Sequence, residues 1–181
     1  MYDVRDRDFL GRLNSATKYP ETPTYHFMDP KTGMLQEDQA VDFSGHQFVQ
    51  VTEKIDGTNA RVIVFPRRRE FRQAWVIGSR EDLLACDEDA MPNGSLGIVD
   101  ALSATANRIC LTSPASDFDK VRVYFFEVYG GNVGKAARQY AGDKTRFGYR
   151  LFDIMEFGSD QFDEVMGMSR EQISVWRDRG L

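Results

Sequence analysis

Residues 48–65 read FVQVTEKIDGTNARVIVF, and this stretch carries the clearest β signal in the chain. Apolar residues, many of them β-branched, dominate both of its halves, as is typical of strands. Asp56 and Gly57 stand between the halves, and an Asp-Gly pair flanked by such runs is a strong signal for a hairpin turn. The pattern predicts two antiparallel strands, with Lys54 at the end of the first strand and entering the turn.

The rest of the chain mixes strand patterns with helical ones. Apolar runs bounded by turn residues predict strands, and apolar residues at helical spacing predict helices. The predicted strands are residues 74–78, 121–130 and 149–155, and the predicted helices are residues 98–109 and 168–179, with a short polar helix or arm at 1–16. Residues 81–97 predict an exposed loop. Hairpin-linked strands with interspersed helices indicate an α+β fold dominated by antiparallel sheet.

Local signals refine this outline at three places. Two prolines exclude a helix at residues 18–25, so we expect an extended segment whose tyrosines pack on the body of the domain. Residues 29–33, which read DPKTG, predict a turn. Ser169 is the expected N-cap of the last helix, because its hydroxyl can accept a hydrogen bond from the first turn.

Length and composition favour one ordinary domain of 181 residues. No apolar run approaches the roughly 18 residues of a membrane span, so we expect a cytoplasmic protein with no membrane partner. The first residues lack the basic-then-apolar pattern of a secretory signal. Cys86 and Cys110 show neither metal-ligand spacing nor a disulfide framework, as is typical of a reducing compartment.

The charge of the chain restricts its partners. A net charge of −5 and a pI near 5.1 argue against a general nucleic-acid coat protein but allow a local basic groove. Two basic runs are candidates for such a groove, and each is also readable as solvated surface. The runs are Arg67, Arg68, Arg69 and Arg72, and Lys135, Arg138, Lys144, Arg146 and Arg150.

Lys54 has neighbours that permit a nucleophilic role. Glu53 and Asp56 are carboxylates close to it in sequence, and Gly57 lets the backbone approach a bound ligand closely. A lysine amine attacks only when it is neutral, a form that burial or a neighbouring cation favours. Taken alone, the string is more typical of a hairpin with a surface lysine, so its meaning depends on the other segments.

Four segments, taken in order, resemble the motifs of covalent nucleotidyltransferases, the superfamily of ATP-dependent RNA and DNA ligases and mRNA capping enzymes. The segments are residues 53–59 (EKIDGTN), 78–80 (GSR), 125–130 (FFEVYG) and 151–155 (LFDIM). Residues 17–23 and the Thr-Asn ending of the first motif resemble the nick-sealing RNA ligase 2 family in particular. The resemblance covers residues 17–156 and implies a nucleotidyltransferase (ATP-grasp-like) domain.

The resemblance implies a role for each residue of the first two motifs. Lys54 would attack the α-phosphorus of ATP, release pyrophosphate and carry AMP. Glu53 would help to select adenine, or else is a strand-edge carboxylate, and Ile55 would line the same nucleotide site. Asn59 would contact the nucleotide or the reacting nick. Arg80 would hold the ribose or the 5′-phosphate through its fork of donors, or else is a surface arginine.

The later motifs would complete the nucleotide site. Glu127 would accept a hydrogen bond from a ribose hydroxyl; otherwise it is a carboxylate at the end of a buried strand, which itself needs a partner. Phe152 would stack on adenine, or else is a core phenylalanine. Asp153 would bind metal or only brace its strand. The resemblance further implies ATP with Mg²⁺ or Mn²⁺, and RNA with nicked or broken ends, duplex among them, as the partner.

Two later motifs of the family are missing. No Glu-Gly followed by an apolar pair occurs after Phe152, where residues 163–167 read DEVMG, and no lysine follows Lys144. We expect residues 1–181 to be the N-terminal portion of an incomplete ligase catalytic domain, and a stand-alone degenerate relative is the alternative. A chain without these groups is expected to adenylylate poorly.

Three classes of function stay open. The first is ATP-dependent RNA ligation in RNA repair, with a DNA ligase or a capping-type transferase as its variants among enzymes. The second is a non-catalytic nucleotide- or nucleic-acid-binding module, which the missing lysines and the acidic pI favour. The third is a purely structural domain.

Overall fold

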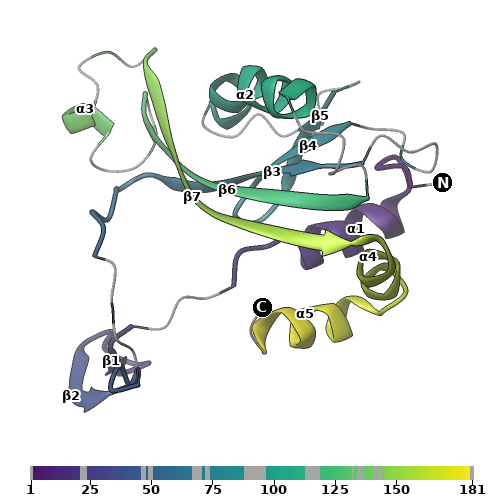
Figure 1. The fold of residues 1–181 in the computed structure, drawn as a ribbon. Helices are drawn as coiled ribbons and strands as arrows, with labels where there is room; N and C mark the ends of the chain where they lie inside the picture. Colours follow the sequence, from purple (N-terminus) through teal and green to yellow (C-terminus); the bar gives the residue numbers. More distant parts are fainter. Residues whose placement is uncertain are drawn as a thin grey trace. The chain divides into compact units, whose positions relative to one another are not determined.

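The structure, a computed structural model, describes most of the chain as two compact units (Figure 1). The larger unit comprises Met1–Tyr19 and Ile55–Leu181, and the smaller comprises Pro20–Lys54. The described residues are 2–20, 24–45, 48, 51–66, 71, 74–87, 97–112, 119–131, 133, 137–140, 143 and 145–179. Each unit builds its own sheet.

A five-stranded sheet organises the larger unit, with the strand order β5-β4-β3-β6-β7. The strands are β3 (Thr58–Val64), β4 (Trp75–Ser79), β5 (Leu83–Cys86), β6 (Lys120–Gly130) and β7 (Phe147–Gly158). Each neighbouring pair is antiparallel. The predicted α+β fold with a mainly antiparallel sheet is therefore confirmed.

Helices cover both faces of this sheet (Figure 1). One face carries α2 (Ile98–Thr112), and the other carries α1 (Arg7–Ala16), α4 (Ser159–Met166) and α5 (Arg170–Asp178). Successive side chains of a strand point to opposite faces. Val62 accordingly packs in the core beneath α2, whereas its neighbour Ile63 packs in the core with α1, α4 and α5.

The smaller unit is a hairpin of β1 (His26–Met28) and β2 (Leu35–Gln39). Its turn is the one predicted at residues 29–33: the Gly33 N–H donates to the Asp29 carbonyl at 2.8 Å, and Gly33 has a φ of +69°. None of the unit's described residues is buried. Backbone hydrogen bonds and ring contacts therefore stabilise this hairpin rather than a core of its own.

The predicted hairpin around Asp56 and Gly57 is wrong. Residues 51–57 form no strand, and β3 begins only at Thr58. The physical reason is that both edges of β3 are already hydrogen-bonded, to β4 on one side and to β6 on the other. No edge is left for a preceding strand, so Lys54 lies in irregular chain ahead of β3.

Most of the other predicted elements are confirmed, namely the strands at 74–78, 121–130 and 149–155 and the helices at 98–109, at 168–179 and near the N-terminus. The loop predicted at residues 81–97 is wrong where β5 forms, and its residues 88–96 lie outside the described part of the chain. The run of four residues in β5 is buried throughout and pairs with β4, which overrides the polar character of the residues around it. The pattern also failed to predict α4, whose Phe162, Val165 and Met166 form a buried helical stripe.

Ser169 closes the N-terminus of α5 with a capping box. Its Oγ accepts the Gln172 N–H at 3.3 Å, and its own N–H donates to the Gln172 side chain at 2.9 Å. Ser169→Ala should lower the free energy of unfolding by about 1 kcal/mol, because one amide of the first turn loses its acceptor. Urea denaturation measures the change. Ser169→Thr keeps the hydroxyl and serves as the control; equal losses in both variants would contradict a capping role.

Candidate functional site

The predicted site residues of the larger unit gather at one end of the sheet, where β3 begins. The strand register places Asn59 of β3 beside Glu127 of β6, and Ala60 beside Ser79 of β4. Neighbouring strands lie about 4.8 Å apart, so β4 and β6 are roughly 10 Å from each other across β3. Arg80 follows Ser79 directly. The fold therefore brings three predicted site residues from three separate motifs to one end of the sheet.

Three polar side chains of these strands lie on the face opposite α2. Phe125 of β6 packs in the core with α1, α4 and α5, and Glu127 two residues later points to the same side. Asn59 and Arg150 lie directly across from Glu127 on the two neighbouring strands, so they share its face. Phe152 contacts Phe125, with 6.3 Å between their ring centroids. One face thus carries an amide, a carboxylate, a guanidinium and an aromatic ring.

Glu127 anchors the backbone that follows Lys54. Its Oε1 accepts the Gly57 N–H at 3.1 Å. The preceding amide is held as well, because the Asp56 N–H donates to the hydroxyl of Tyr140 at 3.0 Å. Tyr140 belongs to the short helix α3 (Ala137–Tyr140). The partner that a carboxylate at this position needs is therefore a backbone amide of the first motif.

Gly57 lies directly against the main chain of β6. A Cβ atom at this position would come within 2.3 Å of the Val128 carbonyl oxygen and 3.1 Å of the Glu127 Cγ. Such a contact is too short for any side chain, so the backbone would have to move. The glycine of the first motif is thus required by packing against β6, and not by a hairpin turn.

Phe152 is the exposed member of an aromatic cluster. Its side chain is 46% exposed, which rules out the alternative of a core phenylalanine. The ring of Tyr19 meets Phe152 at 5.1 Å and Phe125 at 4.9 Å, in both cases edge-on. The expectation that the segment after the first helix packs a tyrosine on the body of the domain is confirmed for Tyr19. The two partners hold the Phe152 ring in place while one side of it stays open to solvent.

Arg80 presents its side chain from a tight turn. The Ser79 N–H donates to the Asp82 carbonyl at 2.8 Å, and the Asp82 N–H donates back to the Ser79 hydroxyl at 3.0 Å. The Arg80 side chain is 65% exposed and lies 3.7 Å from Glu81, a distance typical of a weak surface ion pair. Lys18 donates to the same Glu81 carboxylate at 2.7 Å and holds its pKa below the usual value.

Arg61 is a residue of this region that the motif comparison did not single out. It is fully buried, and its Nη1 donates to the carbonyls of Ser79 and Arg80 at 2.8 and 3.1 Å. Its Nη2 donates to the side chain of Asn14 on α1. Burial lowers the pKa of Arg61 to about 9, so the guanidinium remains charged at neutral pH. A single charge inside the apolar run of residues 60–65 was the sequence signal for this residue.

The residues around the lysine divide between the two units. Glu53 and Lys54 end the smaller unit, and both are exposed. Ile55 begins the larger unit and is half-buried. Lys54 is therefore joined to the described end of the sheet through the peptide chain that leads to Asp56 and Gly57.

Metal ligands are not assembled within the part of the chain that the structure describes. There, no group of three or more His, Cys, Asp or Glu side chains is placed to hold an ion. The Asp153 carboxylate accepts the N–H of the next residue, Ile154, at 2.8 Å. The described residues thus hold no carboxylate cluster of the kind that binds a metal ion without help from a ligand.

Of the two basic runs, Arg146 and Arg150 are described and exposed. Outside the described residues lie Arg67, Arg68, Arg69, Arg72, Lys135 and Lys144, together with the side chain of Arg138. None of the described helices is both long and apolar enough to cross a membrane.

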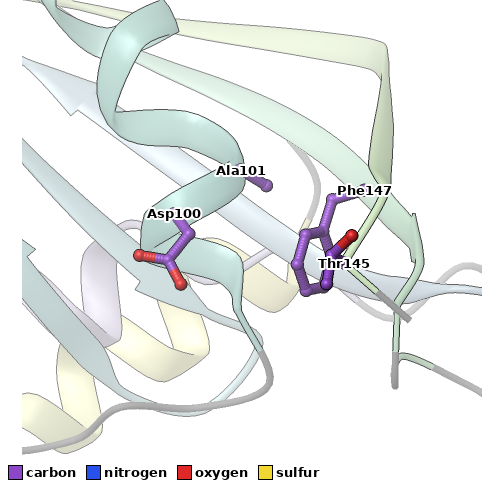
Figure 2. A pocket seen from close by; sticks show the side chains of 4 residues that line it. All are labelled: Asp100, Ala101, Thr145 and Phe147. Atoms are coloured by element: carbon purple, nitrogen blue, oxygen red, sulfur yellow. The ribbon is translucent and has the colours of Figure 1, made fainter. Parts of the chain in front are cut away.

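A separate hollow of about 570 Å³ opens beside α2 (Figure 2). Asp100 and Ala101 line it from the helix, and Thr145 and Phe147 line it from the chain at the start of β7. Phe147 belongs to the core beneath α2, which is the face opposite Glu127. Among its described lining residues the charged group is the Asp100 carboxylate.

Gly57→Ala should lower the free energy of unfolding by about 1–3 kcal/mol, because the new methyl group overlaps the Val128 carbonyl and forces the backbone to shift. Urea denaturation measures this change. Gly45→Ala is the matched control: no atom lies within 4 Å of a Cβ built there, and its backbone is not left-handed. If both variants unfolded alike, the close approach of Gly57 to β6 would be refuted.

Comparison with known proteins places this arrangement in a family. A family model described as RNA ligase matches residues 47–176, which include all four motif segments and most of the larger unit. Searches of curated proteins and of solved structures found no match. The family match spans well over half of the chain and confirms the resemblance seen in the motifs. This chain belongs to the RNA ligase family.

Proposed function

We propose that this chain carries the adenylyl-transfer site of an ATP-dependent RNA ligase, with Lys54 as the nucleophile. The observation that carries the proposal is the anchoring of the chain just after Lys54. Glu127, from the third motif, accepts the amide of Gly57, from the first motif. Two motifs that are far apart in sequence are thus in direct contact, as expected if they form one site.

The first reaction step requires an amine and a positioned phosphate. The Lys54 Nζ attacks the α-phosphorus of ATP in line with the bond to pyrophosphate. The N–P bond forms, the bond from the α-phosphorus to the bridging oxygen breaks, and the amine proton passes to solvent. Negative charge grows on the transferred phosphoryl group and on the leaving group, so nearby cations favour the step. Arg80 supplies an exposed guanidinium for this purpose.

In this proposal the nucleotide is held by residues on the face of the sheet opposite α2. Phe152 offers an aromatic surface for adenine, and stacking of a base on such a ring contributes about 1–3 kcal/mol. The Asn59 Oδ1 is buried and has no hydrogen-bond partner among the described residues. A buried acceptor without a donor is costly, and a ligand hydroxyl or amino group would relieve that cost. Glu53 and Ile55 flank the lysine and complete the proposed nucleotide contacts.

Mg²⁺ or Mn²⁺ enters the proposal only as a counter-ion that neutralises charge on the phosphates of ATP. The described residues build no carboxylate cluster for it, so no step is assigned to an ion held by the protein.

RNA is the proposed second substrate. In the sealing steps AMP moves from Lys54 to a 5′-phosphate, and a 3′-hydroxyl then attacks that phosphate and releases AMP. Arg146 and Arg150 are exposed on and next to β7, and Arg150 shares the face of Glu127. Guanidinium groups pair well with backbone phosphates. These positions fit an RNA end approaching the same face as the nucleotide.

Lys54→Ala should abolish transfer of label from α-³²P-ATP to the protein in the presence of Mg²⁺, because the attacking amine is gone. Lys31→Ala, which removes another exposed lysine of the smaller unit, should leave labelling unchanged. Label that survives Lys54→Ala would refute the assignment of the nucleophile. Absence of labelling in the unaltered chain, together with a thermal midpoint that ATP does not raise, would refute the nucleotide site as a whole.

Phe152→Ala should weaken ATP binding by about 5- to 150-fold, which corresponds to the loss of one stacked base at about 1–3 kcal/mol. Leu151→Ala is the matched control. Leu151 is the preceding residue on β7, is exposed to a similar extent (48%), and pairs with Phe126 of the opposite face. Calorimetric titration with ATP compares the two. Equal weakening by both variants would show that β7 as a whole, and not the ring, affects binding.

A further inference from the structure

Arg61 is a charged residue placed where an apolar one would be expected. It is fully buried in β3, and among the described residues no carboxylate lies within ion-pair distance of its guanidinium. Its Nε has no hydrogen-bond partner in the part of the chain that the structure describes. The carboxylates of Glu81 and Asp82 act on it only at longer range, where they raise its pKa against the lowering by burial. Burying a charge without a direct ion pair is unfavourable, and an apolar side chain of similar volume is often equally stable or more so. Stability alone therefore does not explain an arginine at this position.

The hydrogen bonds of Arg61 converge on the turn that presents Arg80. The Nη1 group donates to the carbonyls of both Ser79 and Arg80. The Nη2 group donates to the Asn14 side chain, and the Asn14 Nδ2 donates onward to the Glu81 carbonyl at 2.9 Å. Three consecutive carbonyls, from residues 79 to 81, are thus held either directly by Arg61 or through its partner.

Gly78 provides the space for this arrangement. A Cβ atom at Gly78 would lie 3.0 Å from the Arg61 Nε and 3.1 Å from the Asp82 carbonyl oxygen. A side chain here would press on the guanidinium group, so the missing Cβ gives the arginine room beside the strand. The glycine of the second motif and the buried arginine that follows the first motif are therefore structurally coupled.

We propose that Arg61 is a positioning residue of the ligase site, which fixes the backbone of residues 79–81 so that the exposed Arg80 side chain is presented to the substrate phosphate. The inference rests on the proposed role of Arg80. Arg61 itself touches no substrate, since its side chain is buried and its donors are directed at backbone and amide oxygens. Its contribution is to hold the turn in one conformation before the substrate binds.

Hydrogen exchange tests the positioning role without requiring activity. In Arg61→Met, the amides of residues 79–82 should exchange at least about tenfold faster, while those of β6 and α5 stay unchanged. Arg122→Met is the matched control, because Arg122 pairs with Glu156, far along β6 from residue 127. Faster exchange at 79–82 in that control, or general acceleration across the sheet in Arg61→Met, would overturn the proposal. So would unchanged exchange at 79–82 in Arg61→Met.

Asn14→Ala gives a second route if Arg61→Met fails to fold. It removes one acceptor of Arg61 and the donor to Glu81, and Asn14 is a half-buried residue of α1 rather than a core residue. The same amides should exchange about threefold faster or more in this variant. Exchange identical to that of the unaltered chain would contradict the network.

Labelling kinetics then connect the turn to Arg80. Arg61→Met and Arg80→Ala should each reduce the rate of labelling by ATP, and the double variant should be no slower than Arg80→Ala alone, because both changes remove the same contact. If the two rate reductions multiplied in the double variant, Arg61 could not be acting through Arg80, and the proposal would be overturned. A complete lack of labelling in the unaltered chain, together with a thermal midpoint that ATP does not raise, would refute the proposed function, whereas the exchange result would still decide whether Arg61 orders the turn.

Discussion

Hydrogen bonding along both edges of β3 is the constraint on which the rest of this structure depends. The strand is held between β4 and β6, so its residues are aligned with two other motifs at once. The registers Ala60–Ser79 and Asn59–Glu127 are consequences of that pairing. A slip of one residue would turn each side chain of β3 to the wrong face and separate the motifs. The site therefore depends on the core pairing of the sheet.

The same constraint explains why small residues occur where the motifs have them. At Gly57, just before β3, the chain lies against the backbone of β6. The Val128 carbonyl there leaves no room for a side chain. Gly78 leaves room for a buried guanidinium beneath β4. In both places the glycine allows two elements of the protein to pack closely. This packing in turn determines where Glu127 and Arg80 lie in the candidate site.

Much of this arrangement could be predicted from the sequence, because the spacing of apolar residues and the order of the motifs are both visible along the chain. The strands around Phe125 and Phe152 and the capped helix at Ser169 followed from such patterns. The hairpin at Asp56 and Gly57 did not, since an Asp-Gly pair cannot report that both edges of the next strand are occupied. The sequence also did not predict the hydrogen bond between Glu127 and Gly57, or the hydrogen bonds of Arg61. Each joins residues that only the folded sheet brings together, and no spacing in the chain encodes such contacts.

The contact between Gly57 and Glu127 spans 70 residues of sequence, which has a consequence for synthesis of the protein. Chains emerge from the ribosome at about 5–20 residues per second, so the segment after Lys54 waits roughly 4 to 14 s for the strand that holds it. Until β6 has been made, β3 can pair on one side only. The start of β3, with the Gly57 amide that precedes it, is thus among the later parts of this sheet to take its final shape, while most of the N-terminal half is already available to fold.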